Sequence, residues 1–234
     1  MPADVSAQPD APALSVAASA PSTAASASEA SAATPSARPP ARQLLLEAAA
    51  RLFYAQGVGA TGIDTITAAA GVAKKSLYNN FASKADLVAA YLEARHEEWL
   101  DLYRARVAIA ATPSEQVLAV FDAYLDHANF AYEHGFRGCG LLNAAAELPV
   151  GHPGRLAVRQ HKEEVEHLLA THVAAYQADR PAPAASPDAS ERTAGLARHL
   201  SFLLEGAMAR AGLEGDDSQL RDAKRIAQQM LAGL

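Results

Sequence analysis

The stretch Ala60–Phe81, ATGIDTITAAAGVAKKSLYNNF, decides the fold. It predicts two short helices joined by a tight turn. Side-chain oxygens of Thr61 and Asp64 can accept hydrogen bonds from the free N–H groups that open the first helix. Gly71 supplies the left-handed residue that ends this helix. The pair therefore predicts a helix-turn-helix unit.

The second helix of this unit is almost wholly polar on one side. Val72 and Leu77 are expected to be buried and to anchor it, while Lys, Ser, Tyr and Asn side chains point outward. Such a helix fits the major groove of DNA, because lysine binds phosphate or guanine and asparagine pairs with adenine. An ordinary helical hairpin with a solvated face has the same composition. Composition alone leaves both interpretations open.

A longer pattern of fixed spacings surrounds the unit, from Arg42 to Leu92. A basic residue and an apolar helix ending in Phe and Gly precede a Thr-containing turn, an Ile-rich helix, an Ala-Gly-Val turn and the pattern Leu-Tyr-x-x-Phe-x-x-Lys-x-x-Leu. The residues in these places are Arg42, Ala48, Ala49, Leu52, Phe53, Gly57, Thr61, Ile63, Ile66, Ala70, Gly71, Val72, Leu77, Tyr78, Phe81, Lys84 and Leu87. This pattern resembles the TetR family of transcriptional regulators, and so many spacings make the resemblance specific.

The chain departs from the family pattern in the second helix. Lys75 and Ser76 stand where Gly and Thr are more usual, and Asn79 stands where His is frequent. These departures concern the operator sequence and leave the fold unaffected. The residues expected to contact DNA are Arg42, Thr61, Thr65, Lys74, Lys75, Ser76, Tyr78, Asn79, Asn80 and Lys84.

The resemblance implies an all-α protein with three parts. Residues 1–37, rich in Ala, Ser and Pro, bury too little to offset the entropy of ordering and are expected to be a disordered tail. Residues 38–83 are expected to form the helix-turn-helix domain. Residues 84–234 are expected to form a larger helical domain that binds an effector and pairs with a second copy through its last two long helices. Small residues there, Gly206, Ala207 and Ala211, permit close approach.

Apolar periodicity and capping signals predict the remaining helices. Ser83 and Asp86 form a start resembling a capping box, and Thr112, Pro113 and Glu115 form a strong one. No strand-like alternation is long enough to predict a sheet. Outside the helix-turn-helix unit, the expected helices span about 41–56, 83–110, 113–131, 140–147, 153–178, 190–211 and 217–232, with a loop at 179–190.

The distribution of charge is compatible with DNA binding although the chain carries a net charge of −6. Residues 38–92 hold six basic and three acidic side chains and are therefore net positive, by +3. The acidity lies elsewhere, so global charge does not exclude a nucleic-acid partner.

The lone cysteine, Cys139, excludes an intrachain disulfide. No apolar run reaches the length of a membrane span and no signal peptide is recognisable, so we expect a cytoplasmic protein without a membrane partner.

The effector pocket is expected among the helices that follow residue 84. Asn143 and Glu147 lie four apart on an otherwise apolar short helix and would face inward, where His127, His161 and His199 could converge on them. Such a set admits a metal, but its spacing matches no known motif, and buried polar contacts explain it more simply. We therefore assign no metal and no cofactor. The candidate pocket residues are Phe121, Tyr124, Leu125, Leu141, Asn143, Glu147, His161, Val165, Leu168, His199 and Leu203.

Three functions compete at this stage. A homodimeric repressor would bind a pseudopalindromic operator and be released by a small molecule. An enzyme could use Glu147 with a histidine as acid and base, but no nucleophile–base pair or phosphate loop supports it, so we expect no catalytic residues. A ligand-binding protein that has lost DNA binding would not need Lys74, Lys75, Tyr78 and Lys84 together. Cys139, beside a helix start, could act as a redox sensor.

Overall fold

The computed structural model describes residues 39–180 and 189–233, and all regular structure in these ranges is α-helical. The expected tail at residues 1–37 and most of the expected loop at 179–190 lie outside the described residues. The helices are α1 (Ala41–Gln56), α2 (Ile63–Ala70), α3 (Lys74–Asn80), α4 (Lys84–Ala108), α5 (Pro113–Ala128), α6 (Gly140–Ala146), α7 (Pro153–Ala178), α8 (Ala189–Glu214) and α9 (Ser218–Ala232). The all-α prediction is confirmed.

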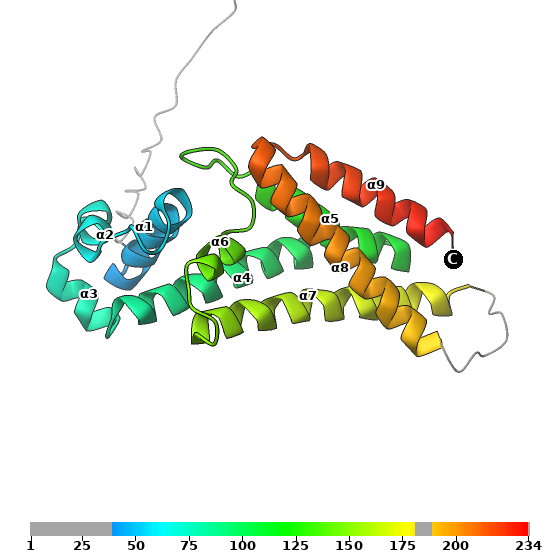
Figure 1. Ribbon diagram of the computed structural model, residues 1–234, viewed down its shortest axis with the longest axis horizontal. Helices are drawn as coiled ribbons and strands as arrows, with labels where there is room; N and C mark the ends of the chain where they lie inside the picture. Colours follow the sequence, from blue (N-terminus) through cyan, green and yellow to red (C-terminus); the bar gives the residue numbers. More distant parts are fainter. Residues whose placement is uncertain (1–38, 181–188, 234) are drawn as a thin grey trace, which may run out of the picture. The chain divides into compact units, whose positions relative to one another are not determined.

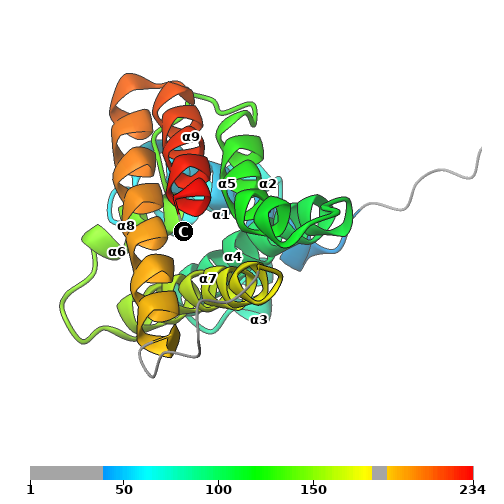
Figure 2. The ribbon, with the colours of Figure 1, turned by 90° about the vertical axis from the view of Figure 1, so that its right-hand side faces the viewer.

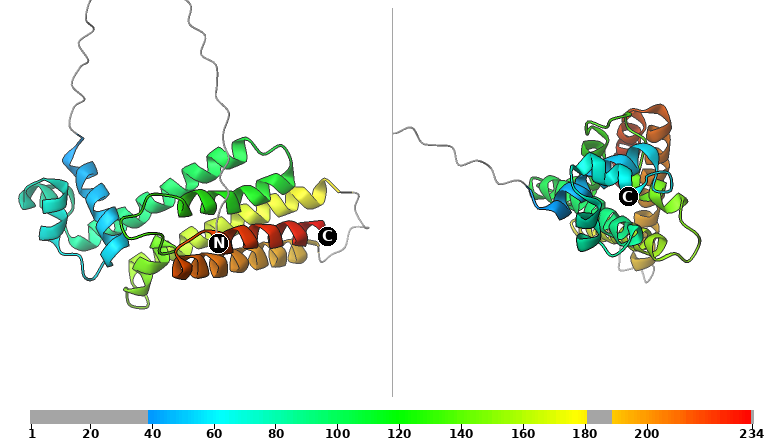
Figure 3. Two further views of the ribbon diagram at one scale, coloured as in Figure 1. Left: turned by 90° about the horizontal axis from the view of Figure 1, so that it is seen from above. Right: turned by 90° about the vertical axis from the view of Figure 1, so that its left-hand side faces the viewer.

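The helices form two groups that share α4. Helices α1, α2 and α3 pack on one another at the N-terminal end of α4 (Figure 1). Helix α5 packs against α4, α7 and α9, and α8 packs against α7 and α9. Two further directions of view show α8 and α9 side by side (Figures 2 and 3).

Three of the predicted helix ends, at Ser83, Thr112 and Gly71, are confirmed. Ser83 Oγ accepts from the Asp86 N–H at 3.1 Å. Thr112 and Glu115 form the full reciprocal capping box at the start of α5. Gly71 ends α2 in the left-handed conformation, at φ 62° and ψ 35°. These ends are decided by residues a few positions apart, which is why the sequence predicts them.

Two details of the prediction were wrong. The residue that caps α2 is Gly62, which makes no side-chain cap. Thr61 is buried, and its hydroxyl donates to the Gly57 carbonyl oxygen at 2.6 Å, which ties the turn back onto the end of α1. Helix α5 ends at Ala128 rather than near residue 131, because the backbone leaves the helical conformation at its C-cap Asn129, at φ −89° and ψ 8°, where the Asn129 side chain also donates to the Leu125 carbonyl oxygen at 2.8 Å.

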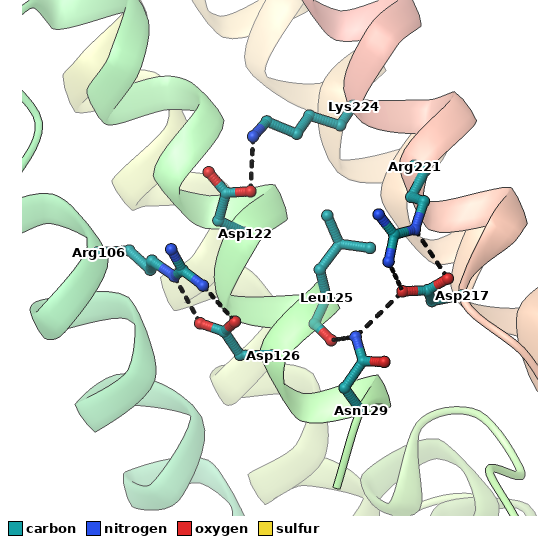
Figure 4. A network of polar contacts seen from close by, with 8 residues as sticks. All are labelled: Arg106, Asp122, Leu125, Asp126, Asn129, Asp217, Arg221 and Lys224. Atoms are coloured by element: carbon teal, nitrogen blue, oxygen red, sulfur yellow. Dashed lines mark hydrogen bonds and ion pairs between the residues drawn. The ribbon is translucent and has the colours of Figure 1, made fainter. Parts of the chain in front are cut away.

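One polar network holds the outer edge of α5 to its two neighbours (Figure 4). Asp126 is paired with Arg106 of α4, and Asp122 accepts from Lys224 of α9 at 2.6 Å. The Asn129 amide also donates to Asp217, which is paired with Arg221 on α9. The apolar side of α5 is buried in the core, including Val117 and Phe121. Helix α5 is thus fixed on both its apolar and its polar sides.

Helix α8 passes very close to the segment that precedes α6. A Cβ atom built on Gly212 would lie 2.5 Å from the backbone nitrogen of Gly138 and 2.6 Å from its Cα. Gly138 itself has a φ of 79°, a conformation that favours glycine. The two backbones therefore meet without a side chain between them.

We predict that Gly212→Ala destabilises the protein by more than about 2 kcal/mol, because the added methyl group meets backbone atoms that cannot move aside. Gly195→Ala, on the same helix with open space around its Cα, is the matched control. It should stabilise the protein by about 0.5–1 kcal/mol through helix propensity. Urea unfolding of both variants measures the difference, and equal effects would contradict the close approach.

Candidate nucleic-acid interface and internal cavity

Helix α3 presents a polar face anchored by a single buried leucine. Leu77 is fully buried, and Val72 in the turn before the helix is half-buried. The side chains of Lys74, Lys75, Tyr78, Asn79 and Asn80 are exposed, and Ser76 is half-buried. Tyr78 is 50% exposed, which is unusual for an aromatic side chain on a helix with so few apolar residues. The outward face of α3 therefore carries the predicted donors.

Some of these side chains already have partners. Lys74 Nζ lies 2.8 Å from Asp64 Oδ1 on α2, and this hydrogen bond raises the pKa of Lys74. Asn80 donates to the Ser76 carbonyl oxygen at 2.8 Å. Within the described residues, the side chains of Lys75, Tyr78 and Asn79 make no hydrogen bond or ion pair. These three are consequently free to bind another molecule.

Residues around α3 extend the polar surface. Thr65 is exposed on α2, and the Arg42 guanidinium lies over the Phe81 ring, 5.2 Å from its centroid. Lys84 Nζ lies 3.4 Å from the Gly59 carbonyl oxygen, beside the N-terminal turn of α4. Thr61 is the exception among the candidates, since its hydroxyl is buried and occupied. It does not offer its side chain to a partner.

Two side chains from the α6 region hold the end of α1 and the turn that follows it. Glu147 Oε1 accepts from the Val58 N–H at 2.9 Å, and its Oε2 accepts from the Gly59 N–H at 2.5 Å. Arg137 donates to the Tyr54 and Ala55 carbonyl oxygens at 2.8 Å and 2.5 Å. The α6 segment thereby satisfies backbone groups that the end of α1 leaves free.

The Tyr54 side chain completes this contact, which we call the α1–α6 junction (Tyr54, Val58, Gly59, Arg137 and Glu147). Its hydroxyl accepts from the Arg137 N–H at 2.6 Å and donates to the Gly138 carbonyl oxygen at 3.2 Å. Burial raises the pKa of the Tyr54 hydroxyl, so it is present as the neutral donor at neutral pH.

A cavity lies inside the bundle next to this junction. Its walls come from α1, α4, α5, α6, α7 and α8, and the free space within it is ≈30 Å³, enough for a water molecule. The residues that line it are Tyr54, Arg95, His96, Trp99, Tyr124, His127, Cys139, Gly140, Leu141, His161, Lys162, Val165 and Met208.

The candidate pocket residues divide into three groups. Tyr124, Leu141, His161 and Val165 line the cavity. Phe121 is fully buried in the core, and Leu125, Leu168 and Leu203 are half-buried outside the cavity wall. Asn143, Glu147 and His199 are exposed and were placed wrongly. Asn143 donates to the Arg137 carbonyl oxygen at 2.9 Å, because the short helix turns its polar side toward the preceding loop and α1.

The expected convergence of Asn143 and Glu147 with histidines therefore does not form. Across residues 39–180 and 189–233, no group of three His, Cys, Asp or Glu side chains is arranged to hold a metal ion. Cys139 is buried at the N-cap of α6, with no disulfide partner. None of the helices in these ranges combines the length and apolar character needed to cross a bilayer.

Sequence reasoning missed the contribution of α4 to the cavity. His96 and Trp99 lie three residues apart on α4, and both are buried. The His96 and His161 rings stack with centroids 4.0 Å apart, and Trp99 lies 5.1 Å from the Tyr124 ring. The spacing of the only tryptophan and a histidine on one helix face was the available signal.

The ionisable groups of the cavity are neutral or paired. Burial lowers the pKa of His127 to about 4, and burial together with the neighbouring His96 lowers the pKa of His161. Lys162 Nζ is 2.7 Å from Glu205 Oε1 and 3.1 Å from the Tyr124 hydroxyl. Burial raises the pKa of Tyr124. At neutral pH the cavity wall therefore carries no unbalanced charge from these groups.

Comparison with known proteins supports the helix-turn-helix assignment. Residues 45–91 match the model of the family "Bacterial regulatory proteins, tetR family". The HTH-type transcriptional regulator TtgR of Pseudomonas putida is 42% identical over 64 residues, which are 27% of this chain and 30% of TtgR. The HTH-type transcriptional activator FasR of Mycolicibacterium smegmatis is 31% identical over 101 residues, 43% of this chain and 44% of FasR. These matches cover less than half of the two curated relatives.

Solved structures extend the similarity to the rest of the chain. A TetR-family transcriptional regulator from Streptomyces coelicolor has a TM-score of 0.71 and 32% identity, covering 82% of this chain and 95% of that one. The regulatory protein TetR from Rhodobacter sphaeroides has a TM-score of 0.67 and 26% identity, covering 81% and 97%. The similarity thus includes both the α1–α3 unit and the larger helical part. The chain belongs to the TetR family.

Proposed function

We propose that this protein is a DNA-binding transcriptional regulator that binds a pseudopalindromic operator as a homodimer and releases it when a small molecule enters its C-terminal part. The observation that carries the proposal is the outward face of α3. Lys75, Tyr78 and Asn79 are exposed there without intrachain partners, on a helix fixed by Leu77. Residues 38–83 form the reading domain in this proposal, and residues 84–234 form the effector and dimerisation domain.

The proposed DNA contacts fall into two classes. Arg42, Lys75, Tyr78 and Lys84 contact phosphates, which gives affinity without sequence preference. Lys84 suits this role because the first turn of α4 adds free N–H groups that favour an anion. Asn79 and Lys74 read base edges, and Lys74 exchanges its contact with Asp64 for a base on binding. Thr65, Ser76 and Asn80 supply further polar contacts from the same surface.

The proposed dimer interface is the outward stripe of α8, followed by the outward side of α9. On α8 the exposed residues recur every three or four positions, at His199, Phe202, Gly206, Ala209 and Leu213. Phe202 is 65% exposed and Leu213 is 88% exposed, so the stripe leaves apolar surface uncovered. Of the three small residues expected to permit close approach, Ala207 and Ala211 are buried in the protomer's own core. Gly206 alone lies on the stripe.

A homodimer explains how a short α3 would reach useful affinity. Two copies of α3 placed about 34–36 Å apart meet successive turns of the major groove on one side of DNA. Phosphate and base contacts are then made twice by one molecule, and the two half-sites are related by the symmetry of the dimer.

The α1–α6 junction supports a physical route from the cavity to α3. Tyr54 lines the cavity and also makes the hydrogen bonds of the junction. A ligand that displaces Tyr54, or Cys139 at the start of α6, would move the end of α1 relative to α4. Only a difference in ligand affinity between the two arrangements is needed to shift their populations. The sign of regulation is proposed as repression, although FasR is named an activator.

We predict that Lys75→Ala weakens binding to all DNA and reduces the salt dependence of affinity by roughly two charges per dimer. Asn79→Ala should instead lower affinity by about 1–3 kcal/mol on the preferred fragment and change it little on unrelated DNA. The fragments are the DNA flanking the protein's own gene and an unrelated sequence, titrated over a salt series. Arg159→Ala, at an exposed position on α7, is the control. If the unmodified protein and all three variants bound both fragments equally weakly, the result would contradict sequence-specific DNA binding by α3.

We predict that Phe202→Glu converts the dimer to a monomer, because a carboxylate replaces the apolar centre of the α8 stripe. Sedimentation over a concentration series measures the mass. Val150→Glu, at a position 91% exposed in the loop before α7, controls for an added charge. A Phe202→Glu protein that stays dimeric would exclude this face as the interface.

We predict that Glu147→Ala speeds hydrogen exchange at the Val58 and Gly59 amides and lowers the unfolding free energy by about 1–3 kcal/mol, because two N–H groups lose a charged acceptor. Glu163→Ala, exposed on α7, is the control. Amide exchange followed by mass spectrometry compares the two. Unchanged protection in Glu147→Ala would show that the junction does not hold the turn.

A further inference from the structure

Three side chains that line the internal cavity carry a buried nitrogen atom that lacks a hydrogen-bond partner. Trp99 Nε1, His127 Nδ1 and His161 Nδ1 are buried and unpaired, and all three side chains line this one cavity. Each of these side chains is at least nine-tenths buried. An unpaired buried polar atom is costly, so three of them around one space indicate that the space is built for a polar occupant.

Two of these nitrogens, Trp99 Nε1 and His161 Nδ1, have defined hydrogen-bonding roles. The indole of Trp99 can only donate. His161 Nε2 lies 3.4 Å from the Glu93 carboxylate, which favours the proton on Nε2 and leaves Nδ1 as an acceptor. A hydroxyl group satisfies both, because its oxygen accepts from the indole and its proton is donated to the imidazole.

The rest of the wall selects against a charged ligand. Lys162 is paired with Glu205 and Arg95 with Glu98, so both of these cations have a counter-charge within the protein, and His96 Nε2 is hydrogen-bonded to Glu164. A carboxylate or ammonium ligand would enter without a free partner and lose its hydration.

The wall also favours a flat ring. Tyr54, Trp99 and Tyr124 present aromatic surface, and Leu141, Val165 and Met208 present aliphatic surface. Aromatic rings pack with such neighbours in offset or edge-on arrangements. We propose that the effector of this regulator is a small uncharged phenol, whose hydroxyl group bonds to Trp99 and His161 in the internal cavity. This proposal rests on the proposed function and names the chemistry of its ligand.

A ligand could enter the cavity from the side where Cys139 and Met208 form the wall. Cys139 and Met208 line the cavity and also an outer groove of ≈420 Å³ between the α6 start and α8, so these two side chains are common to the walls of both spaces. Met208 is unbranched and polarisable, and can change rotamer to open the passage and enlarge the cavity around a ring. The small resting space of ≈30 Å³ is then the closed state of the site.

The test uses the full-length protein and three probes of similar shape. p-Cresol has the hydroxyl group, 4-methylanisole can accept but not donate, and toluene can do neither. Titration calorimetry should give p-cresol an affinity roughly ten-fold or more above toluene, with 4-methylanisole between them. Trp99 is the only tryptophan, so its fluorescence should change with the same midpoint. Equal affinities for p-cresol and toluene, or binding of none of the probes, would overturn the proposal and leave a cavity that holds only water.

Two variants distinguish the contribution of the His161 hydrogen bond to ligand affinity from the contribution of the cavity's shape. His161→Phe keeps a ring stacked on His96 but removes the acceptor, so p-cresol should lose at least about five-fold in affinity while toluene is unaffected. His167→Phe, exposed on α7, the helix that carries His161, is the matched control and should leave both affinities unchanged. A loss of toluene binding in His161→Phe would indicate a changed shape, and the probe series on the unmodified protein then decides alone.

Operator binding measured on the same preparation keeps this proposal separate from the proposed function. A protein that binds its operator but does not prefer p-cresol over toluene refutes the phenol assignment and retains the regulator. A protein that prefers p-cresol but reads no DNA supports the assignment and refutes the regulator. Release of operator DNA by p-cresol and not by toluene supports both.

Discussion

Helix α4 packs against α1 and also against α5 and α7, and it must fit both groups of helices at once. The rest of the fold depends on this constraint. Its N-terminal half buries Leu87 and Tyr91, and the Tyr91 ring lies edge-on to Phe53 of α1 at 5.4 Å. Its C-terminal half buries Trp99 and Tyr103 among α5 and α7, where Tyr103 is bonded to His172 at 2.6 Å. A helix moves along and about its axis largely as a unit, so neither half can shift alone.

The α1–α6 junction adds a second connection between the same two groups of helices. It acts on backbone groups at the end of α1, whereas α4 acts through its buried side chains. The position of α3 therefore depends on two sets of contacts, and Tyr54 takes part in one of them while facing the cavity. An occupant of the cavity would act on the proposed DNA-binding surface through Tyr54, a side chain that already lines the cavity.

The fold and the exposure of the polar face of α3 were largely predictable from sequence, because they depend on local signals. The capping box of Thr112, the left-handed Gly71 and the buried Leu77 are each determined by neighbours within one or two turns. Thr61, Asn143 and Glu147 were misplaced because their partners are contributed by other elements or by a preceding loop. The cavity was only partly predicted. Its α4 wall, His96 and Trp99, lies on a helix whose mixed composition does not reveal which side faces inward.

The meeting of Gly138 and Gly212 has a mechanical consequence. Most contacts between helices pass through side chains, which absorb small displacements by changing rotamer. Here backbone faces backbone, so nothing between α8 and the segment before α6 can yield. Gly138 is next to Arg137, which bonds to the end of α1, and Gly212 is next to Leu213 on the exposed stripe of α8. A displacement of α8 would therefore reach the end of α1 through backbone atoms and the Arg137 hydrogen bonds, without being absorbed by an intervening side chain.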